Sequence, residues 1–252
     1  MESKNPIQVT DRLFLVLETL AELGPSTLAA LCQNMDLNKS TVHRLLSSLM
    51  YVGYVKQEPE TGKYMLSFKL LTLSNKILSR MDILEIVRPF FKRLSEETGE
   101  TVHFVQIDGY DAVYIYKEEA YQNSIRMASK VGSRIPLYCS GVGKAMLADM
   151  PEDRVKEIWD SSTITALTPM TITDFDRFQE VLKEIRVRGY ALDNEENELG
   201  VRCIAVSLPD YRGKTKFAFS VSAPASRMDD TRIRELSQII LRTKEEILRE
   251  LC

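Results

Sequence analysis

The residues best suited to chemistry in this sequence share one short stretch, NKSTVHRLLSS. His43, one of only two histidines in the chain, stands beside Arg44, with hydroxyls nearby at Ser40, Thr41 and Ser47. A histidine next to a serine can act as the base that activates a nucleophile. The same residue types also suit DNA, because hydroxyls hold phosphate oxygens while arginine and histidine reach base edges in the major groove.

Apolar spacing decides which of these side chains share a face. Val42, Leu45, Leu46 and Leu49 recur at i, i+3, i+4 and i+7, the pattern of an amphipathic helix. The polar side chains then project together from a convex face, and no third residue orients His43, so we expect no catalytic residue here. The remaining interpretations are a solvated polar face or a DNA contact. The expected DNA-contacting residues are Lys39, Ser40, Thr41, His43, Arg44 and Ser47.

The elements around this helix favour the DNA contact, because residues 1–67 follow the order of a winged helix-turn-helix. A helix with an apolar face from Leu13 ends at Gly24-Pro25, and a short helix capped by Ser26 follows. A polar turn over residues 36–38 leads into the stretch above. The segments YVKQ and YML then pair as a hairpin across EPETGK.

The hairpin supplies two more expected DNA contacts, Lys56 and Lys63, on either side of a tip whose Glu58 and Glu60 repel phosphates. Residues 1–75 hold seven basic and seven acidic side chains, so this domain is neutral. One copy should therefore bind DNA weakly. We expect a homodimer or tetramer that reads palindromic half-sites of a double-stranded operator.

The remaining chain predicts a linker helix over residues 68–84 and an α/β domain over residues 85–252. A helix from Val87 ends at Gly99, the strands TVHFVQI and AVYIYK form a hairpin, and CIAVSL pairs with KFAFSVSA. Further helices are expected near Gly143, over residues 174–188 and after Asp230. The predicted fold class is therefore α+β, with an antiparallel sheet covered by helices.

A second constellation lies in this domain, around SGVGKAMLA. Its glycines let the chain turn sharply into a helix whose first amides, at Gly141 and Val142, suit a carboxylate. The motif is not a phosphate-binding P-loop, because Tyr138 and Ala145 occupy two of its required positions. Ser220 and Ser222 alternate on a presumed strand, so their hydroxyls share a face. Asp193 and Cys203 bracket an acidic loop.

Each of these residues also has an ordinary structural interpretation. Met127, Ile135 and Val201 can belong to the core, and the two serines can satisfy backbone groups. The run DNEENE, with Glu195, Glu196 and Glu198, is expected to be a solvated loop. His103 is expected to pack in the core or at an interface.

The chain resembles regulators of the IclR family along nearly its whole length. The resemblance is carried by LNKSTVHRLLSSLMYVGYV, KYMLSFKLLTL, EETGETVHF, IPLYCSGVGKAMLA, GYALDNEENELGVRCIAVSLPD and FSVSAP, in the order of the family. KSTVHR, SIRMASKVGSRIPLY and DNEENELGVRCIAV are most similar to the members that respond to 2-keto-3-deoxygluconate. The resemblance implies a winged-helix DNA-binding domain, a linker helix and a GAF-like effector domain, in a dimer or tetramer that is most often a repressor.

The resemblance also implies which residues bind a small carboxylate effector. Gly141, Val142, Ser220 and Ser222 would hold the carboxylate, and Asp193 would accept hydrogen bonds from the hydroxyls of a sugar acid. The implied apolar wall consists of Met127, Ile135, Val201 and Cys203. Arg126 and Arg134 are further candidates for the carboxylate.

Composition excludes several other classes of protein. No apolar run approaches the ~20 residues of a membrane span, and the N-terminus lacks the apolar region of a secretory signal. Four scattered cysteines and two histidines provide no zinc motif, so we expect no metal, no cofactor and a reduced, cytoplasmic protein.

Three hypotheses compete. The first is a ligand-responsive transcription factor, most often a repressor but sometimes an activator. The second is an enzyme that acts on a small acid through Cys203 or Cys139, although no histidine is placed to activate either thiol. The third is a winged helix that contacts protein and has no DNA target.

Overall fold

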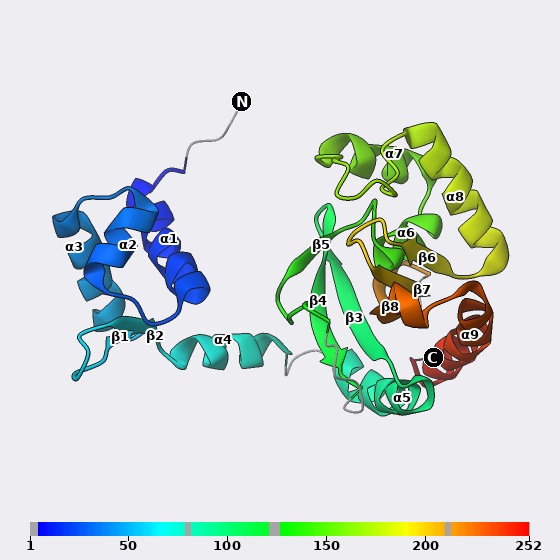
Figure 1. Ribbon diagram of the computed structural model, residues 1–252, viewed down its shortest axis with the longest axis horizontal. Helices are drawn as coiled ribbons and strands as arrows, with labels where there is room; N and C mark the ends of the chain where they lie inside the picture. The colour runs from blue at the N-terminus through cyan, green and yellow to red at the C-terminus, as the bar shows by residue number, and fades with distance from the viewer. Residues whose placement is uncertain (1–4, 79–81, 121–126, 210–212, 252) are drawn as a thin grey trace. The chain divides into compact units, whose positions relative to one another are not determined.

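The computed structural model is drawn in Figure 1 and describes residues 5–78, 82–120, 127–209 and 213–251. The chain divides into two compact units, Met1–Arg80 (unit 1) and Met81–Cys252 (unit 2), and each is described by itself. The fold class is α+β, which confirms the prediction.

Unit 1 has the predicted order of three helices, a hairpin and a further helix. Its described elements are α1 (Gln8–Leu23), α2 (Leu28–Met35), α3 (Lys39–Tyr51), β1 (Val55–Gln57), β2 (Tyr64–Leu66) and α4 (Lys69–Leu78). Val16 of α1, Leu31 of α2 and Leu46 of α3 are fully buried and belong to one apolar cluster. Apolar periodicity therefore fixes how the three helices pack.

Asn38 determines where α3 begins. Its side-chain oxygen accepts the backbone N–H of Thr41 and the hydroxyl of Ser40, each at 2.9 Å. This is the contact by which an N-cap satisfies an otherwise unpaired helical amide. The helix ends at Tyr51, just before Gly53, whose φ of +81° favours glycine.

The prediction that Ser26 caps α2 was wrong. The cap is Thr27, whose side chain accepts the N–H of Ala30. Ser26 instead pairs with Tyr64 of β2, where each backbone N–H donates to the other carbonyl at 2.9 and 2.8 Å. This bridge fastens β2 of the hairpin to the segment between α1 and α2.

The structure describes only part of the linker helix predicted over residues 68–84. Helix α4 is described to Leu78, residues 79–81 lie outside the described residues, and α5 runs over Asp82–Thr98. Helix α5 therefore begins earlier than the predicted start at Val87. The reason is that Leu84 is buried together with Val87 and Phe91, and so extends the same apolar face.

Unit 2 is built on a six-stranded antiparallel sheet with the strand order β5-β4-β3-β8-β7-β6. The strands are β3 (Thr101–Asp108), β4 (Asp111–Glu118), β5 (Arg134–Pro136), β6 (Ala191–Asn194), β7 (Val201–Pro209) and β8 (Thr215–Pro224). The remaining helices are α6 (Gly141–Ala148), α7 (Glu152–Ser161), α8 (Phe175–Arg188), the 3-10 helix η1 (Ala225–Arg227) and α9 (Asp230–Leu251). Both predicted strand pairs, β3 with β4 and β7 with β8, are present.

Helices cover both faces of this sheet (Figure 1). On one face lie α5 and α9, and the ring of Phe91 in α5 is 5.2 Å from that of Phe104 and 5.1 Å from that of Phe219. On the other face α6 lies against small residues of the sheet, such as Ala205 and Ala218. The small side chains let α6 approach the strands closely.

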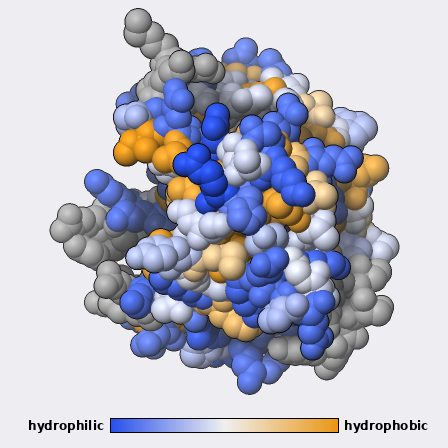
Figure 2. Space-filling model, turned by 90° about the vertical axis from the view of Figure 1, so that its left-hand side faces the viewer, coloured by the Kyte–Doolittle hydropathy of each residue, from blue (hydrophilic) through white to orange (hydrophobic). Residues whose placement is uncertain are grey.

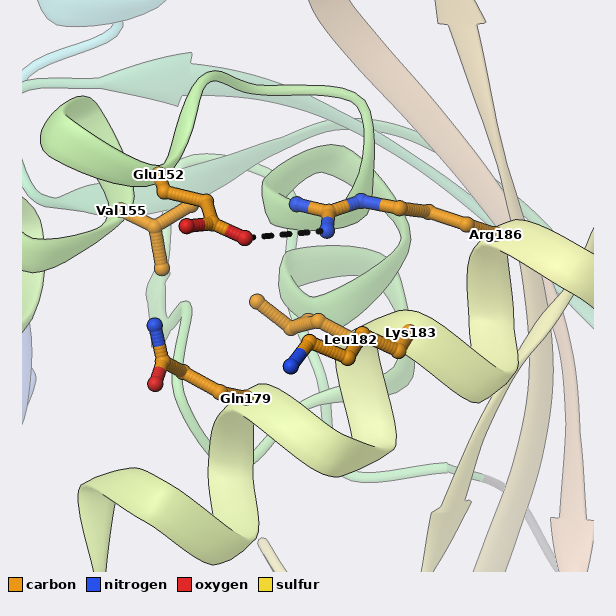
Figure 3. A pocket seen from close by; sticks show the side chains of 6 residues that line it. All are labelled: Glu152, Val155, Gln179, Leu182, Lys183 and Arg186. Atoms are coloured by element: carbon orange, nitrogen blue, oxygen red, sulfur yellow. Dashed lines mark ion pairs between the residues drawn. The ribbon is translucent and has the colours of Figure 1, made fainter.

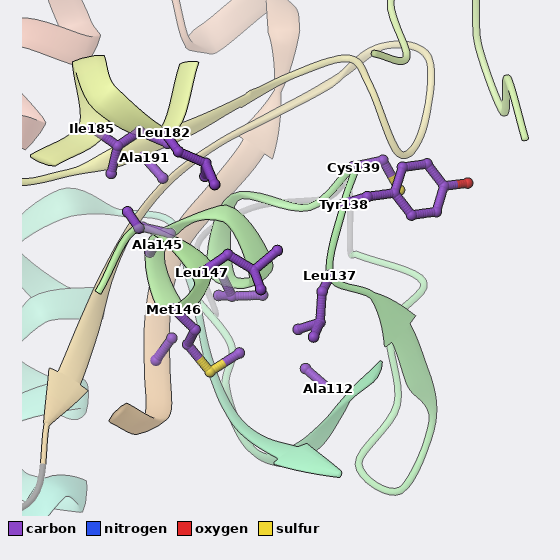
Figure 4. Close-up of a cluster of buried hydrophobic side chains, with 14 of the residues drawn as sticks. Ala112, Leu137, Tyr138, Cys139, Ala145, Met146, Leu147, Leu182, Ile185 and Ala191 are labelled. Carbon is purple, nitrogen blue, oxygen red and sulfur yellow. The ribbon is translucent and has the colours of Figure 1, made fainter. Parts of the chain in front are cut away.

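Helix α6 is buried along its whole length. Figure 4 shows its residues Ala145, Met146 and Leu147 beside Leu182 and Ile185 of α8. Side chains from α6, α8 and the sheet thus form one apolar cluster, which holds the N-terminus of α6 in a fixed place over the strands.

Candidate functional site

Helix α3 presents the predicted polar face. Val42, Leu45, Leu46 and Leu49 are buried. Lys39, Ser40, His43, Arg44 and Ser47 are exposed and Thr41 is half-buried. The hydroxyl of Ser47 donates to the carbonyl of His43 at 2.9 Å, so it is held against the helix. The space-filling view shows mostly hydrophilic side chains interrupted by separate apolar patches (Figure 2).

A surface hollow beside this face adds a residue that the sequence did not indicate. It has a volume of about 460 Å³ and lies between α1 and α3, where Arg12 joins Thr41, Arg44 and Ser48. Arg12 and Arg44 therefore place two guanidinium groups around one hollow, an arrangement suited to phosphate oxygens. Arg12 was missed because helical spacing within α1 gives no sign of what α1 lies next to.

The hairpin carries Lys56 on β1 and Lys63 in its turn, and both are exposed. The turn is closed by the Glu58 N–H, which donates to the Lys63 carbonyl at 2.8 Å. The ammonium of Lys56 lies 5.6 Å from the centre of the Phe68 ring, so this cation rests on an aromatic face.

In unit 2, strand register brings the polar residues of the second constellation together. Ser222 of β8 lies opposite Cys203 of β7, and Cys203 lies opposite Asp193 of β6. In the next row Ser220 lies opposite Ala205 on one side and His103 of β3 on the other. Ser220, Ser222 and Asp193 are all at most 4% exposed, so this is an enclosed polar patch within the sheet.

His103 belongs to this patch, whereas the sequence indicated only a packed histidine. Its Nδ1 lies 3.1 Å from the Ser222 hydroxyl and its Nε2 lies 2.6 Å from the Ser129 hydroxyl. The hydroxyls of Ser220 and Ser222 are 3.3 Å apart. Alternation along the strand TVHFVQI places His103 on one face, but register with β8 was needed to show its neighbours.

The N-terminus of α6 lies against the same patch. A Cβ added to Gly141 would lie 3.3 Å from Cβ of Ala205 and 3.4 Å from the backbone nitrogen of Asp193. A Cβ at Gly143 would lie 2.2 Å from the Leu137 carbonyl oxygen. The chain turns over residues 137–140 directly into α6, as predicted. Neither glycine has a positive φ, so glycine is needed at these positions for close approach and not for an unusual backbone conformation.

The predicted apolar wall is only partly gathered at the patch. Val201 is half-buried and lies two residues from Cys203 on β7. Ile135 is buried opposite Ala112 of β4, within the apolar cluster under α6. Met127 is half-buried, and its carbonyl accepts the ammonium of Lys117 at 2.7 Å.

Of the two arginines suggested for the carboxylate, Arg134 does not lie at the patch. Arg134 is about half exposed and forms ion pairs with Asp108 and Asp111 on the surface. Arg126 lies outside the described residues.

The acidic loop is not fully solvated, which corrects the prediction for Glu196. Glu196 is 6% exposed and forms a buried ion pair with Lys144 of α6, which is 1% exposed. The hydroxyls of Thr168 and Thr171 donate to the carbonyls of Glu195 and Glu196, each at 2.6 Å. The loop is therefore drawn inward, and one turn of it is fastened to α6.

Burial governs protonation in the patch. It raises the pKa of Asp193 to about 7, although Lys144 and two backbone amides favour its carboxylate form. It lowers the pKa of His103 to about 3, with help from the positive charge of Lys117. The imidazole is therefore neutral at physiological pH.

Burial also raises the pKa values of the two candidate thiols. The pKa of Cys139 rises to about 12, and that of Cys203 rises well above its ordinary value, with the nearby Asp193 adding to the effect. A thiol that stays protonated is a poor nucleophile. This removes the chemical basis of the enzyme hypothesis.

Another hollow, shown in Figure 3, lies between α7 and α8 and is lined by Glu152, Val155, Gln179, Leu182, Lys183 and Arg186. There Arg186 pairs with Glu152 and donates to the Ala148 carbonyl at 2.7 Å, which supports the C-terminal end of α6.

The described residues contain no group of three or more His, Cys, Asp or Glu placed to hold a metal. No helix in the described ranges is long and apolar enough to cross a membrane.

Comparison with known proteins covers both units. The model of the IclR helix-turn-helix domain matches residues 9–59, and that of the bacterial transcriptional regulator IclR C-terminal region matches residues 75–249. The DNA-binding transcriptional repressor YiaJ of Escherichia coli is 39% identical over 226 residues, which are 89% of this chain and 80% of that protein. The HTH-type transcriptional regulator KdgR of the same organism is 36% identical over 234 residues, or 92% and 89%.

The chain is also similar to solved structures of transcriptional regulators. The crystal structure of Thermotoga maritima IclR superposes with a TM-score of 0.84 at 31% identity, covering 97% of this chain and 98% of that one. The matched families and these relatives are transcriptional regulators and not enzymes.

Proposed function

The chain belongs to the IclR family of DNA-binding transcriptional regulators, and on that premise we propose that it represses a sugar-acid catabolic operon. A small carboxylate such as 2-keto-3-deoxygluconate would release it from its operator. The effector then binds the operator-free form more tightly, since only such a difference in affinity shifts the equilibrium.

The observation that carries the proposal is the exposed face of α3. Arg44 and His43 project from it while all four apolar residues of the opposite face are buried. Arg12 extends the cationic surface to α1. A capped helix with this face suits the major groove, with phosphates held by the flanking lysines and by Arg12.

The patch in unit 2 supports the class of effector. The N-terminus of α6 supplies amides for a carboxylate. Ser220, Ser222 and Asp193 supply partners for hydroxyl or keto oxygens. One of the relatives, the transcriptional repressor YiaJ, supports repression as the mode of action.

The test is fluorescence anisotropy with a duplex from upstream of the protein's own gene. We expect Arg44→Ala to weaken binding by roughly 10–100-fold, the scale of a lost arginine–guanine pair. Arg154→Ala, which removes an exposed arginine from α7 in unit 2, is the matched control and should leave affinity unchanged. Adding 2-keto-3-deoxygluconate should weaken binding of the unaltered protein.

Two results would count against the proposal. If Arg44→Ala binds the duplex as tightly as the unaltered chain, α3 is not the recognition helix. If 2-keto-3-deoxygluconate tightens DNA binding, release by the effector is wrong and activation replaces it.

A further inference from the structure

The starting point is the position of His103 between two hydroxyls. Both ring nitrogens are within hydrogen-bond distance of a serine, Nδ1 of Ser222 and Nε2 of Ser129. The side chain is 4% exposed, and the edge of the Tyr114 ring packs against it with centroids 5.2 Å apart. The imidazole therefore has little freedom to rotate.

A neutral imidazole has one donor and one acceptor nitrogen, so it assigns a fixed role to each hydroxyl it contacts. The ring is neutral because burial lowers its pKa to about 3. Whichever tautomer is present, the Ser222 hydroxyl uses either its proton or one of its two lone pairs on Nδ1. Its remaining hydrogen-bonding capacity is directed away from His103, on the side where Ser220 and Cys203 lie.

The Nε2 side of the ring meets a different part of the chain. Ser129 lies in the loop that carries Met127, and this loop is also held by Lys117, which donates to the carbonyls of Met127 and Ser129 at 2.7 and 3.0 Å. Lys117 lies opposite His103 in the β3–β4 register. The loop is thus held by Lys117 and by backbone bonds of Tyr114 with Gly132 and Ser133, as well as by the contact of Ser129 with His103.

We infer that His103 is a positioning residue of the effector site, which orients the Ser222 hydroxyl so that the site prefers acids bearing hydroxyl groups over acids without them. This inference rests on the proposed function. The Ser222 hydroxyl lies 3.3 Å from that of Ser220, longer than the ~2.5–3.0 Å usual for such a bond, so an oxygen of the ligand at this place would be a better partner than Ser220. A ligand lacking that oxygen gains no such bond. Without His103, Ser222 can turn and shorten its contact with Ser220, and the advantage of the ligand oxygen shrinks.

Two substitutions of His103 by residues with side-chain amides distinguish its contact with Ser222 from its contact with Ser129. The shorter side-chain amide of H103N would stand where Nδ1 lies and keep the Ser222 contact, whereas the longer amide of H103Q reaches the place of Nε2 and keeps the Ser129 contact. Affinities of the full chain for 2-keto-3-deoxygluconate and for pyruvate, which has no hydroxyl, are measured by titration calorimetry. We expect the unaltered protein to bind 2-keto-3-deoxygluconate roughly tenfold or more tightly than pyruvate.

H103N should retain this preference, and H103Q should lose most of it. Lys117→Met, which releases the loop without touching Ser222, should weaken both ligands by a similar factor and leave their ratio unchanged. A purely structural role for His103 predicts equal losses for both amides, and that result would overturn the inference. Fluorescence of Trp159, the only tryptophan, verifies that each variant is folded.

If H103N does not fold, Ser129→Ala takes its place and should keep the preference; if H103Q does not fold, His103→Leu takes its place and should lose it. Equal affinity of the unaltered protein for both acids would overturn the inference and leave the regulator intact. Binding of neither acid, with DNA binding preserved, would overturn the proposed effector class and this inference with it.

Discussion

Asp193 gives unit 2 a pH dependence whose sign follows from its raised pKa. An aspartate with a folded-state pKa of about 7, instead of 3.8, retains a proton that the unfolded chain has released. Stability therefore falls as pH rises from about 4 to about 7, by at most roughly 4 kcal/mol. His103 acts in the opposite sense, since its lowered pKa costs stability as pH falls below about 6.5.

Asp193→Asn should remove the fall in stability between about pH 4 and pH 7. Asparagine keeps the oxygen that accepts the backbone N–H groups of Glu196 and Asn197 but carries no charge. We expect the variant to match the unaltered protein near pH 4 and to be more stable above pH 7. Urea unfolding followed by Trp159 fluorescence reports on unit 2 alone, because Trp159 lies there. A stability difference that does not change with pH would contradict the assignment.

The buried pair of Lys144 and Glu196 yields a second prediction for single residues. Lys144→Met leaves a buried carboxylate without its cation and should destabilise unit 2 by about 3–5 kcal/mol. Adding Glu196→Leu removes the stranded charge and should restore most of that loss. If the double variant is no more stable than Lys144→Met in urea unfolding, the ion pair does not account for the effect.

Individual residues were the hardest features to predict from sequence. The run DNEENE has the composition of a solvated loop, and nothing within it indicates that Glu196 alone turns inward to Lys144. That placement depends on Thr168 and Thr171, more than twenty residues away in the chain. Ser220 and Ser222 were placed on one face because alternation along a strand decides which side chains share it. Asp193 was indicated only by the resemblance, and strand register was needed to place it opposite Cys203.

At the scale of elements, α6 is held by glycines that have no room for a side chain. A Cβ at residue 143 would collide with the Leu137 backbone oxygen, whereas one at residue 141 would be only a few tenths of an ångström too close to Ala205. We therefore expect Gly143→Ala to cost roughly 1–3 kcal/mol or more and Gly141→Ala distinctly less. Urea unfolding monitored at Trp159 compares them, and equal costs would show that close approach is not the reason.

Elements whose signal is local were predicted well. The spacing of Val42, Leu45, Leu46 and Leu49 correctly predicted the existence of α3 and its buried face. The start of α5 was less predictable, because apolar periodicity precedes Val87 and gives no sign that this helix includes Leu84. The bridge between Ser26 and Tyr64 was invisible for a different reason, since a single backbone pair leaves no pattern in the sequence.

At the scale of the whole molecule, the neutral charge of residues 1–75 limits what one chain can do. Phosphate neutralisation supplies most non-specific affinity for DNA, and it scales with the number of cationic contacts. The exposed cations expected to face DNA in one copy are few, chiefly Arg12, Lys39, Arg44, Lys56 and Lys63. We therefore expect effective binding to depend on a second copy held at a fixed distance.

This requirement predicts how affinity responds to operator geometry. Two half-sites about one helical turn, or a whole number of turns, apart should bind roughly 100-fold tighter than a single half-site, because the second contact becomes intramolecular. Inserting about half a turn between them rotates one half-site to the opposite side of the duplex and should abolish the gain, while inserting a full turn should restore part of it. Anisotropy titrations at constant salt measure this series. Affinity that is insensitive to the half-turn insertion would mean that the two copies of α3 do not bind the operator as one rigid unit.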